Sequence, residues 1–140
     1  MASKQALEHL KNVSMFATCS KKDLGRIARA GKEISMPAGS TIVDQGQAGR
    51  EAFVILDGSA IVKRNGKKIA TLGVGSVVGE LSLLDHGPRT ASVICETDTK
   101  LLVIDQREFL AVLDDVPALS HKVLASLAAK IRDFDRRYYG

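Results

Sequence analysis

The sequence predicts an α+β fold that is mainly β: an antiparallel β-roll of the jelly-roll type with helices before and after it. Two observations support this prediction. Helical spacing of apolar residues is confined to the two ends of the chain, 4–30 and 106–138. Between them, across 33–105, short apolar runs alternate with turn residues, as is typical of barrels, rolls and sandwiches. We therefore expect a single domain over 1–140.

The composition fits one domain with its own core. The chain has 140 residues, 45% of them hydrophobic, and no apolar run approaches the roughly 18 residues that a membrane helix needs. The first residues include an acidic side chain and no apolar stretch, which argues against a secretory signal. We expect a cytoplasmic protein in which Cys19 and Cys95 are reduced and are ordinary small residues in or near the core. A net charge of +4 is too mild to indicate nucleic acid.

Capping residues place the helices at both ends. Ser20 is a predicted N-cap with Asp23 in the first turn, and Gly31 ends that helix. Asp105, with Glu108 three residues on, is typical of a capping box that opens a helix over Gln106–Leu113. The apolar stripe of the last helix predicts core packing or a homodimer seam: Leu119, Val123, Leu124, Leu127, Ile131 and Phe134. The cations that follow read as a solvated helix end: Lys130, Arg132, Arg136 and Arg137.

Six strands are predicted in the central part of the chain. Asn65-Gly66 marks the tightest hairpin, because both residues tolerate the positive φ angles of a type I′ turn. The predicted strands are Ser40–Val43, Glu51–Leu56, Ser59–Lys63, Lys68–Leu72, Ala91–Ile94 and Lys100–Ile104.

One segment, Gly79–Thr90, interrupts the strands and has the features of an anion site. Gly79 precedes a helix-compatible stretch, so backbone N–H groups there are open to an anion. Pro88 fixes the chain before Arg89, whose guanidinium can bind two phosphate oxygens. Glu80 repels a phosphate and suits a neutral donor such as a ribose hydroxyl. These residues indicate a phosphate joined to a sugar, although a salt bridge between Arg89 and Glu80 is the alternative.

The same segment resembles the phosphate-binding cassette of the cyclic nucleotide-binding domain: Gly-Glu-Leu-(small)-Leu, then Pro-Arg-(small)-Ala-(Ser/Thr)-Val. This family includes regulatory subunits of cyclic AMP-dependent protein kinase, bacterial catabolite activator proteins and cyclic nucleotide-gated channels. The resemblance covers about residues 14–135. Glycines at strand junctions also fit the family pattern: Gly46, Gly58 and Gly66.

The resemblance implies a role for each matching residue of the cassette. Arg89 would bind the exocyclic phosphate oxygens and Glu80 the ribose 2′-hydroxyl. Backbone N–H groups near Ser82 and Thr90 would complete the phosphate shell, with Gly79 giving close access. The remaining matching positions are Leu81 within the cassette, Val62 and Ile69 against the base, and Tyr138 or Tyr139 in a lid formed by the last helix.

The expected function is that of a sensor that binds cyclic AMP, with cyclic GMP as the alternative ligand. Thr90 leaves the base open, because the resemblance associates threonine here with guanine in cyclic GMP-dependent kinases, whereas bacterial members with serine or threonine bind cyclic AMP. A phosphodiesterase would need a metal cluster or an activated nucleophile, and the sequence shows neither pattern.

A DNA-reading regulator would need more chain than the residues after Asp115 provide. We therefore expect no catalysis, no cofactor, no membrane contact and no direct nucleic-acid binding. The effector would be another protein or domain, and the chain would be a stand-alone sensor or a fragment of a regulator, channel or enzyme.

Overall fold

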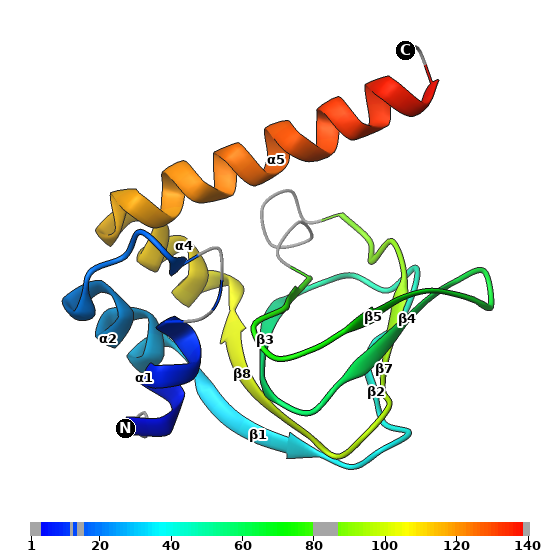
Figure 1. Ribbon diagram of the computed structural model, residues 1–140, viewed down its shortest axis with the longest axis horizontal. Coiled ribbons are helices and arrows are strands. Elements are labelled where there is room, and N and C mark those ends of the chain that lie inside the picture. Colours follow the sequence, from blue (N-terminus) through cyan, green and yellow to red (C-terminus); the bar gives the residue numbers. More distant parts are fainter. Residues whose placement is uncertain (1–3, 12, 14–15, 80–86, 139–140) are drawn as a thin grey trace.

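The computed structural model describes residues 4–11, 13, 16–79 and 87–138. It confirms the predicted fold class, a β-roll with helices beside it (Figure 1). The helices are α1 (Lys4–Lys11), α2 (Lys21–Ala30), α4 (Gln106–Asp115) and α5 (Pro117–Tyr138). The strands are β1 (Lys32–Met36), β2 (Thr41–Val43), β3 (Glu51–Asp57), β4 (Ala60–Arg64), β5 (Lys67–Leu72), β6 (Val77–Val78), β7 (Ser92–Cys95) and β8 (Thr99–Asp105).

The strands form two antiparallel sheets. One has the order β1-β8-β3-β6 and the other β2-β7-β4-β5. The six predicted strands correspond to β2, β3, β4, β5, β7 and β8. The sequence did not predict β1, whose side chains are mostly exposed, or β6, which has only two residues. The alternation of polar and apolar residues in β1 covers only Glu33–Met36, and β6 is too short to show any, so each gives a weak local signal for a strand.

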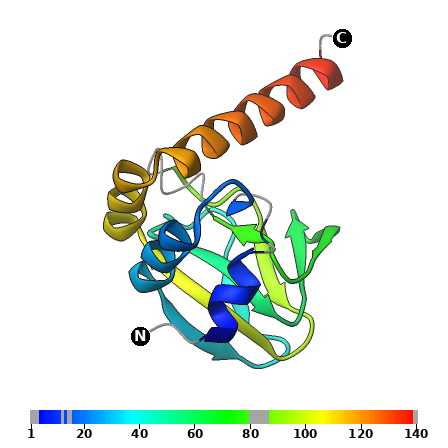
Figure 2. The ribbon, with the colours of Figure 1, turned by 60° about the vertical axis from the view of Figure 1, so that its left-hand side comes forward.

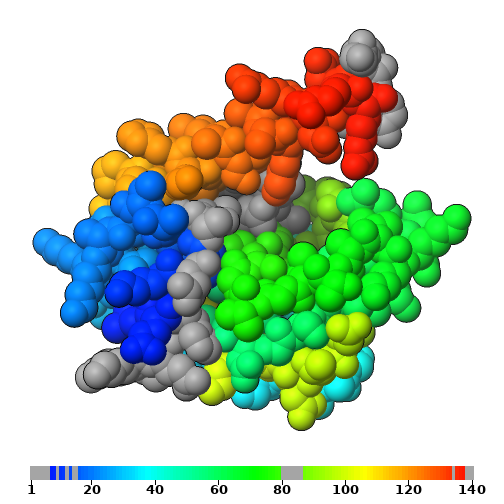
Figure 3. All heavy atoms as spheres, in the orientation of Figure 1, coloured from blue at the N-terminus to red at the C-terminus, as the bar shows by residue number. Residues whose placement is uncertain are grey.

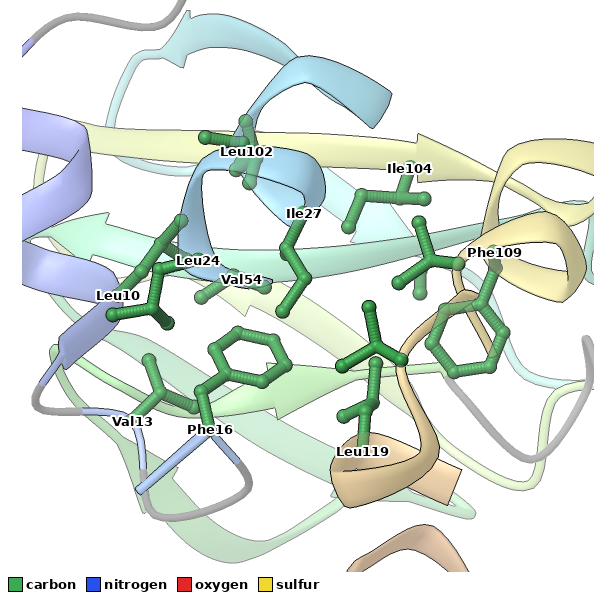
Figure 4. Packing of buried hydrophobic residues seen from close by; sticks show 14 of the residues in the cluster. Leu10, Val13, Phe16, Leu24, Ile27, Val54, Leu102, Ile104, Phe109 and Leu119 are labelled. Carbon is green, nitrogen blue, oxygen red and sulfur yellow. The ribbon is translucent and has the colours of Figure 1, made fainter. Parts of the chain in front are cut away.

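Two cores lie on opposite faces of the first sheet. On one face, side chains from α1, α2, α4 and the start of α5 pack against Val54, Leu102 and Ile104 (Figure 4). On the other face, Ile55 and Leu101 pack toward the second sheet. Because β3 and β8 are buried on both faces, their central residues are apolar without interruption, as in other doubly covered strands.

The predicted caps and turns are present at the two ends of the roll. Ser20 and Asp23 form a reciprocal capping box, with bonds of 3.1 Å and 3.3 Å. Asp105 accepts from the Glu108 N–H at 2.8 Å. Asn65 and Gly66 have φ angles of 53° and 79°, which confirms the left-handed turn between β4 and β5.

Gly31 ends α2 as predicted, but its conformation is not left-handed. Its φ is −113°, which any residue adopts. Glycine is required for space, since a Cβ would lie 2.7 Å from the Leu102 side chain and 3.0 Å from the Val103 carbonyl oxygen. The end of α2 is therefore packed directly on β8.

Both cysteines are free, and Cys95 is buried whereas Cys19 is half-buried. Burial, and after it the Asp23 carboxylate, raises the pKa of the Cys19 thiol. The thiol form is therefore favoured over the reactive thiolate, in keeping with the prediction that these are structural residues.

Helix α5 changes character along its length. Leu119 and Val123 are buried in the core, whereas Leu124 is 64% exposed and Ile131 is 68% exposed. Figure 2 shows the later turns extending away from the roll. The predicted apolar stripe thus contributes core packing in its first half, and the homodimer seam stays a prediction. Within the described residues no helix combines the length and apolarity required to cross a membrane.

We expect Leu102→Ala to lower the free energy of unfolding by about 2–5 kcal/mol, because a fully buried leucine is replaced by a cavity. Leu124→Ala is the matched control, and we expect a change within about 0.5 kcal/mol because that side chain is largely exposed. Urea unfolding followed by circular dichroism measures both values. Equal losses for the two variants would contradict this account of the core.

Candidate functional site

A cavity of about 490 Å³ opens where the second sheet meets the end of β6. Its walls are largely apolar side chains of the strands, and its polar groups are cations and a hydroxyl. The lining residues are Val43, Val62, Arg64, Leu72, Val77, Val78, Gly79, Gly87, Pro88, Arg89, Thr90, Ala91, Val93 and Lys130. An apolar wall with a few convergent polar groups is the usual form of a small-molecule site.

Arg89 is the buried cation of this cavity, with only 8% of its surface exposed. Its Nη1 donates to the Gly79 carbonyl at 3.1 Å, and its Nη2 donates to the Glu51 carbonyl at 2.7 Å. These two carbonyls belong to the residue after β6 and to the start of β3, which pair in the first sheet. The guanidinium is therefore fixed by backbone atoms, and it gives the cavity wall a positive charge.

Gly79 makes room for that guanidinium. Its φ is +84°, which L-residues with a side chain rarely adopt. A Cβ at this position would collide with Nη1 of Arg89 and lie 3.2 Å from the Glu51 carbonyl oxygen. The glycine is thus needed both for the turn and for the close approach of Arg89, whereas the close approach to an anion that the sequence predicted stays a prediction.

The backbone of Arg89 is held on both sides by the loop after β2. The Arg89 N–H donates to the Gln47 carbonyl at 2.8 Å, and the Gly46 N–H donates to the Arg89 carbonyl at 2.9 Å. An isolated bridge between Ala48 and Pro88 extends this pairing. These backbone contacts fix the position of Pro88 and Arg89, the residues that lead into β7.

The structure brings four of the predicted site residues to one cavity: Val62, Gly79, Arg89 and Thr90. Ile69 does not belong to the described lining and is 50% exposed. The reason is a register shift: Val62 pairs with Ala70 and Lys63 with Lys68, which leaves Ile69 as the extra residue of a β-bulge. Leu72 of the same strand lines the cavity instead.

Several predicted residues fall outside the described part of the chain. They are Glu80, Leu81 and Ser82 of the cassette, Tyr139, and the side chain of Tyr138. Their proposed roles remain those that the family resemblance implies. Among the described residues, no group of three His, Cys, Asp or Glu side chains has an arrangement that could hold a metal ion.

Sequence reasoning missed two cations of the cavity, Arg64 and Lys130. A signal existed for Arg64, because it stands two residues after Val62 on β4 and alternate residues share one face of a strand. Lys130 was predicted to belong to a solvated helix end, yet it lines the cavity from α5. Its position depends on how α5 packs across the roll, which no local pattern encodes.

The fold and cavity together define a β-roll with a buried arginine at the wall of a largely apolar cavity. A family model described as the cyclic nucleotide-binding domain matches residues 33–116. The chain therefore belongs to the cyclic nucleotide-binding domain family, which confirms the resemblance that its cassette indicated.

Two curated relatives are each 34% identical to this chain. The Pycsar effector protein XpPycTIR of Xanthomonas perforans matches over 109 residues, which are 77% of this chain and 36% of that protein. The cyclic AMP receptor protein of Thermus thermophilus matches over 104 residues, which are 71% of this chain and 48% of that protein. The chain thus spans between about a third and a half of the length of these relatives.

Solved structures show the same fold. The catabolite activator protein of Thermus thermophilus superimposes with a TM-score of 0.82 at 29% identity, covering 88% of this chain and 60% of that one. A cyclic nucleotide-binding domain from Methylobacillus flagellatus KT has a TM-score of 0.76 at 25% identity, covering 96% of this chain and 81% of that one.

We expect Gly79→Ala to destabilise the fold more than Gly39→Ala, by at least about 1 kcal/mol, the lower end for overpacking. Both glycines have positive φ, +84° and +89°, so both variants carry similar backbone strain. Only at Gly79 does the added methyl group collide with Arg89, whereas nothing lies within 4 Å at Gly39. Urea unfolding of the two variants measures the difference, and equal losses would contradict the proposed fit between Gly79 and Arg89.

Proposed function

We propose that this domain is a sensor that binds a cyclic nucleotide, with cyclic AMP preferred, and changes conformation without catalysing a reaction. The observation that supports this most directly is Arg89, a buried guanidinium anchored on the carbonyls of Gly79 and Glu51 at the wall of a 490 Å³ cavity. A guanidinium fixed in this position can hold phosphate oxygens through charge-assisted hydrogen bonds.

We expect the ligand to lie along the cavity with its phosphate at Arg89. Its exocyclic phosphate oxygens would lie against Arg89, with backbone N–H groups near Ser82 and Thr90 completing the shell. The ribose 2′-hydroxyl would donate to Glu80, as the cassette resemblance implies. The base would then lie against the apolar wall, to which Val62 and Leu72 contribute. A cation stabilises a phosphate without activating water, so this arrangement favours binding over hydrolysis.

Helix α5 is the element that we expect to respond to the ligand. It lines the cavity through Lys130, yet most of its later side chains are exposed. A ligand that makes contacts with α5 only when the helix is close would shift the population toward a closed form. Relatives that share this domain are longer than the chain, so we propose that the readout is made by another domain or protein.

The preference for cyclic AMP rests on the character of the base wall and on one relative. The wall is apolar where Val62 and Leu72 line it, and Thr90 provides a hydroxyl at its edge. The Thermus thermophilus relative is named a cyclic AMP receptor protein. Cyclic GMP stays the alternative ligand, because cyclic GMP-dependent protein kinases from two Caenorhabditis species are also related, at 26% and 29% identity.

We expect Arg89→Ala to weaken binding of cyclic AMP roughly 30-fold to several thousand-fold, because removing one partner of a buried charged pair costs about 2–5 kcal/mol. Calorimetric titration with cyclic AMP and cyclic GMP in parallel measures the loss. Arg136→Ala is the control, since that arginine is exposed on the last turn of α5. If folded Arg89→Ala bound cyclic AMP as tightly as the wild type, the proposed phosphate site would be wrong.

We expect 2′-deoxy cyclic AMP to bind the wild type at least about tenfold more weakly than cyclic AMP, the lower end for a hydrogen bond to a charged group. Glu80→Ala should bind both ligands with equal affinity, because the acceptor of the 2′-hydroxyl is gone. The same titrations provide the test. A wild-type protein that does not distinguish the two ligands would contradict the role proposed for Glu80.

A further inference from the structure

The tip of the β4–β5 hairpin lies beyond the strand ladder that carries it. Within the described residues, the ladder between β4 and β7 ends with the pair Lys63 and Ser92, and Arg64 pairs only with Lys67 across the hairpin. Strand β5 is the edge of the second sheet, and all its residues except Leu72 are exposed. The hairpin, bright green in Figure 3, projects at the right-hand side of the molecule. The position of the tip therefore depends on contacts outside the ladder.

The side chain of Gln45 makes such a contact with the tip. Its Nε2 donates to Asn65 Oδ1, and its Oε1 accepts from the Asn65 N–H, both at 2.9 Å. One amide group thus holds the side chain and the backbone of the same turn residue. Asn65 has a φ of 53°, a conformation that few residues with a side chain adopt. The contact therefore depends on the particular turn that Asn65 and Gly66 form.

Gln45 is itself held in place by the roll. Its N–H donates to Ser92 Oγ at 2.9 Å, and that hydroxyl donates to Asp44 Oδ1 at 3.0 Å. The next two residues of the loop form hydrogen bonds with both backbone groups of Arg89. The loop that holds the hairpin tip is therefore also the loop that holds the arginine of the site.

The hairpin carries part of the cavity wall. Val62 and Arg64 of β4 and Leu72 of β5 line the cavity together with Arg89. A ligand that contacts both the hairpin and Arg89 must match the separation between them. Gln45 does not belong to the described lining, so any effect of its side chain on a ligand passes through the position of this wall.

We propose that Gln45 is a positioning residue for the ligand, because its side-chain amide fixes the β4–β5 hairpin relative to Arg89 before the ligand binds. The proposal rests on the function proposed above, since it concerns the same cavity. Without the amide contact, the hairpin samples other positions, and only the molecules with the hairpin in its native position are competent to bind. The apparent affinity then falls in proportion to the competent fraction.

The first test compares two variants of the same loop. Gln45→Met removes both hydrogen bonds and keeps the length of the side chain. Gln47→Met is the matched control, since Gln47 is also exposed and its side chain forms no hydrogen bond within the described residues. In calorimetric titration with cyclic AMP, we expect Gln45→Met to bind about two- to tenfold more weakly, the range that corresponds to one neutral hydrogen bond. Gln47→Met should bind as the wild type does.

A double-mutant cycle tests whether the contact with Asn65 causes the loss. Asn65→Gly removes the side-chain acceptor, and glycine tolerates the positive φ of this position. We expect Asn65→Gly alone to lose less affinity than Gln45→Met, because the N–H of residue 65 still donates to Gln45. Added to Gln45→Met, Asn65→Gly should cause no further loss, since the donor to Oδ1 is already gone. Additive losses would contradict the proposed contact.

Stopped-flow kinetics with a fluorescent cyclic AMP analogue separate positioning from direct contact with the ligand. If only the competent fraction falls, the apparent association rate constant of Gln45→Met should fall by the same factor as its affinity. Its dissociation rate constant should equal that of the wild type. Faster dissociation with unchanged association would place the effect in the bound complex and overturn the proposal.

Separate outcomes distinguish this proposal from the function on which it rests. A wild type that binds neither cyclic AMP nor cyclic GMP would overturn the proposed function itself; if it prefers cyclic GMP, that ligand replaces cyclic AMP in every titration. A wild type that binds, with Gln45→Met binding as tightly as Gln47→Met, would overturn the role of Gln45 alone. All titrations are run where urea unfolding shows each variant to be fully folded, so a loss of stability is not counted as a loss of affinity.

Discussion

The site depends on the burial of one guanidinium. Removing an arginine from water costs several kcal/mol unless the protein replaces the lost hydrogen bonds. Here the carbonyls of Gly79 and Glu51 replace two of them. Those carbonyls are correctly spaced because β6 pairs with β3, through Phe53 with Val78 and Val54 with Val77. A strand of only two residues thus determines where the charge of the site lies.

The cavity lies where the two sheets meet, and each sheet contributes different groups to its wall. The first sheet holds the Arg89 guanidinium through the ends of β3 and β6, while the second provides the apolar wall and Arg64 through β4, β5 and β7. The loop after β2 connects the two sets of groups. Gly46 and Gln47 form hydrogen bonds with the Arg89 backbone, and Gln45 forms two with Asn65 at the tip of the β4–β5 hairpin. Anything that displaces one sheet against the other will therefore alter the site.

Short-range sequence patterns predicted the turns and helix caps, whose conformation depends on a few neighbouring residues. The type I′ turn at Asn65-Gly66 and the cap at Ser20 each follow from the residues themselves. The glycine at position 79 is required by the approach of Arg89, which the local pattern did not predict. Position 69 could not be placed in the same way, because its side chain is redirected by a β-bulge that depends on pairing across the hairpin. Lys130 likewise reaches the cavity through the packing of α5, which is a property of the whole fold.

A similar contrast, between a buried and an exposed part, supports the role proposed for α5. Its first turns are anchored by Leu119 and Val123 in the core, with Leu127 packed against the same cluster, whereas the described side chains after Leu127 are exposed. A helix held at one end turns small rotations at the anchor into larger displacements at the other end. Under the proposed function, a contact between the ligand and Lys130, about 10 Å along the helix from Val123, would act on this exposed part of α5. The surface offered to another domain or protein would then change without rearrangement of the core.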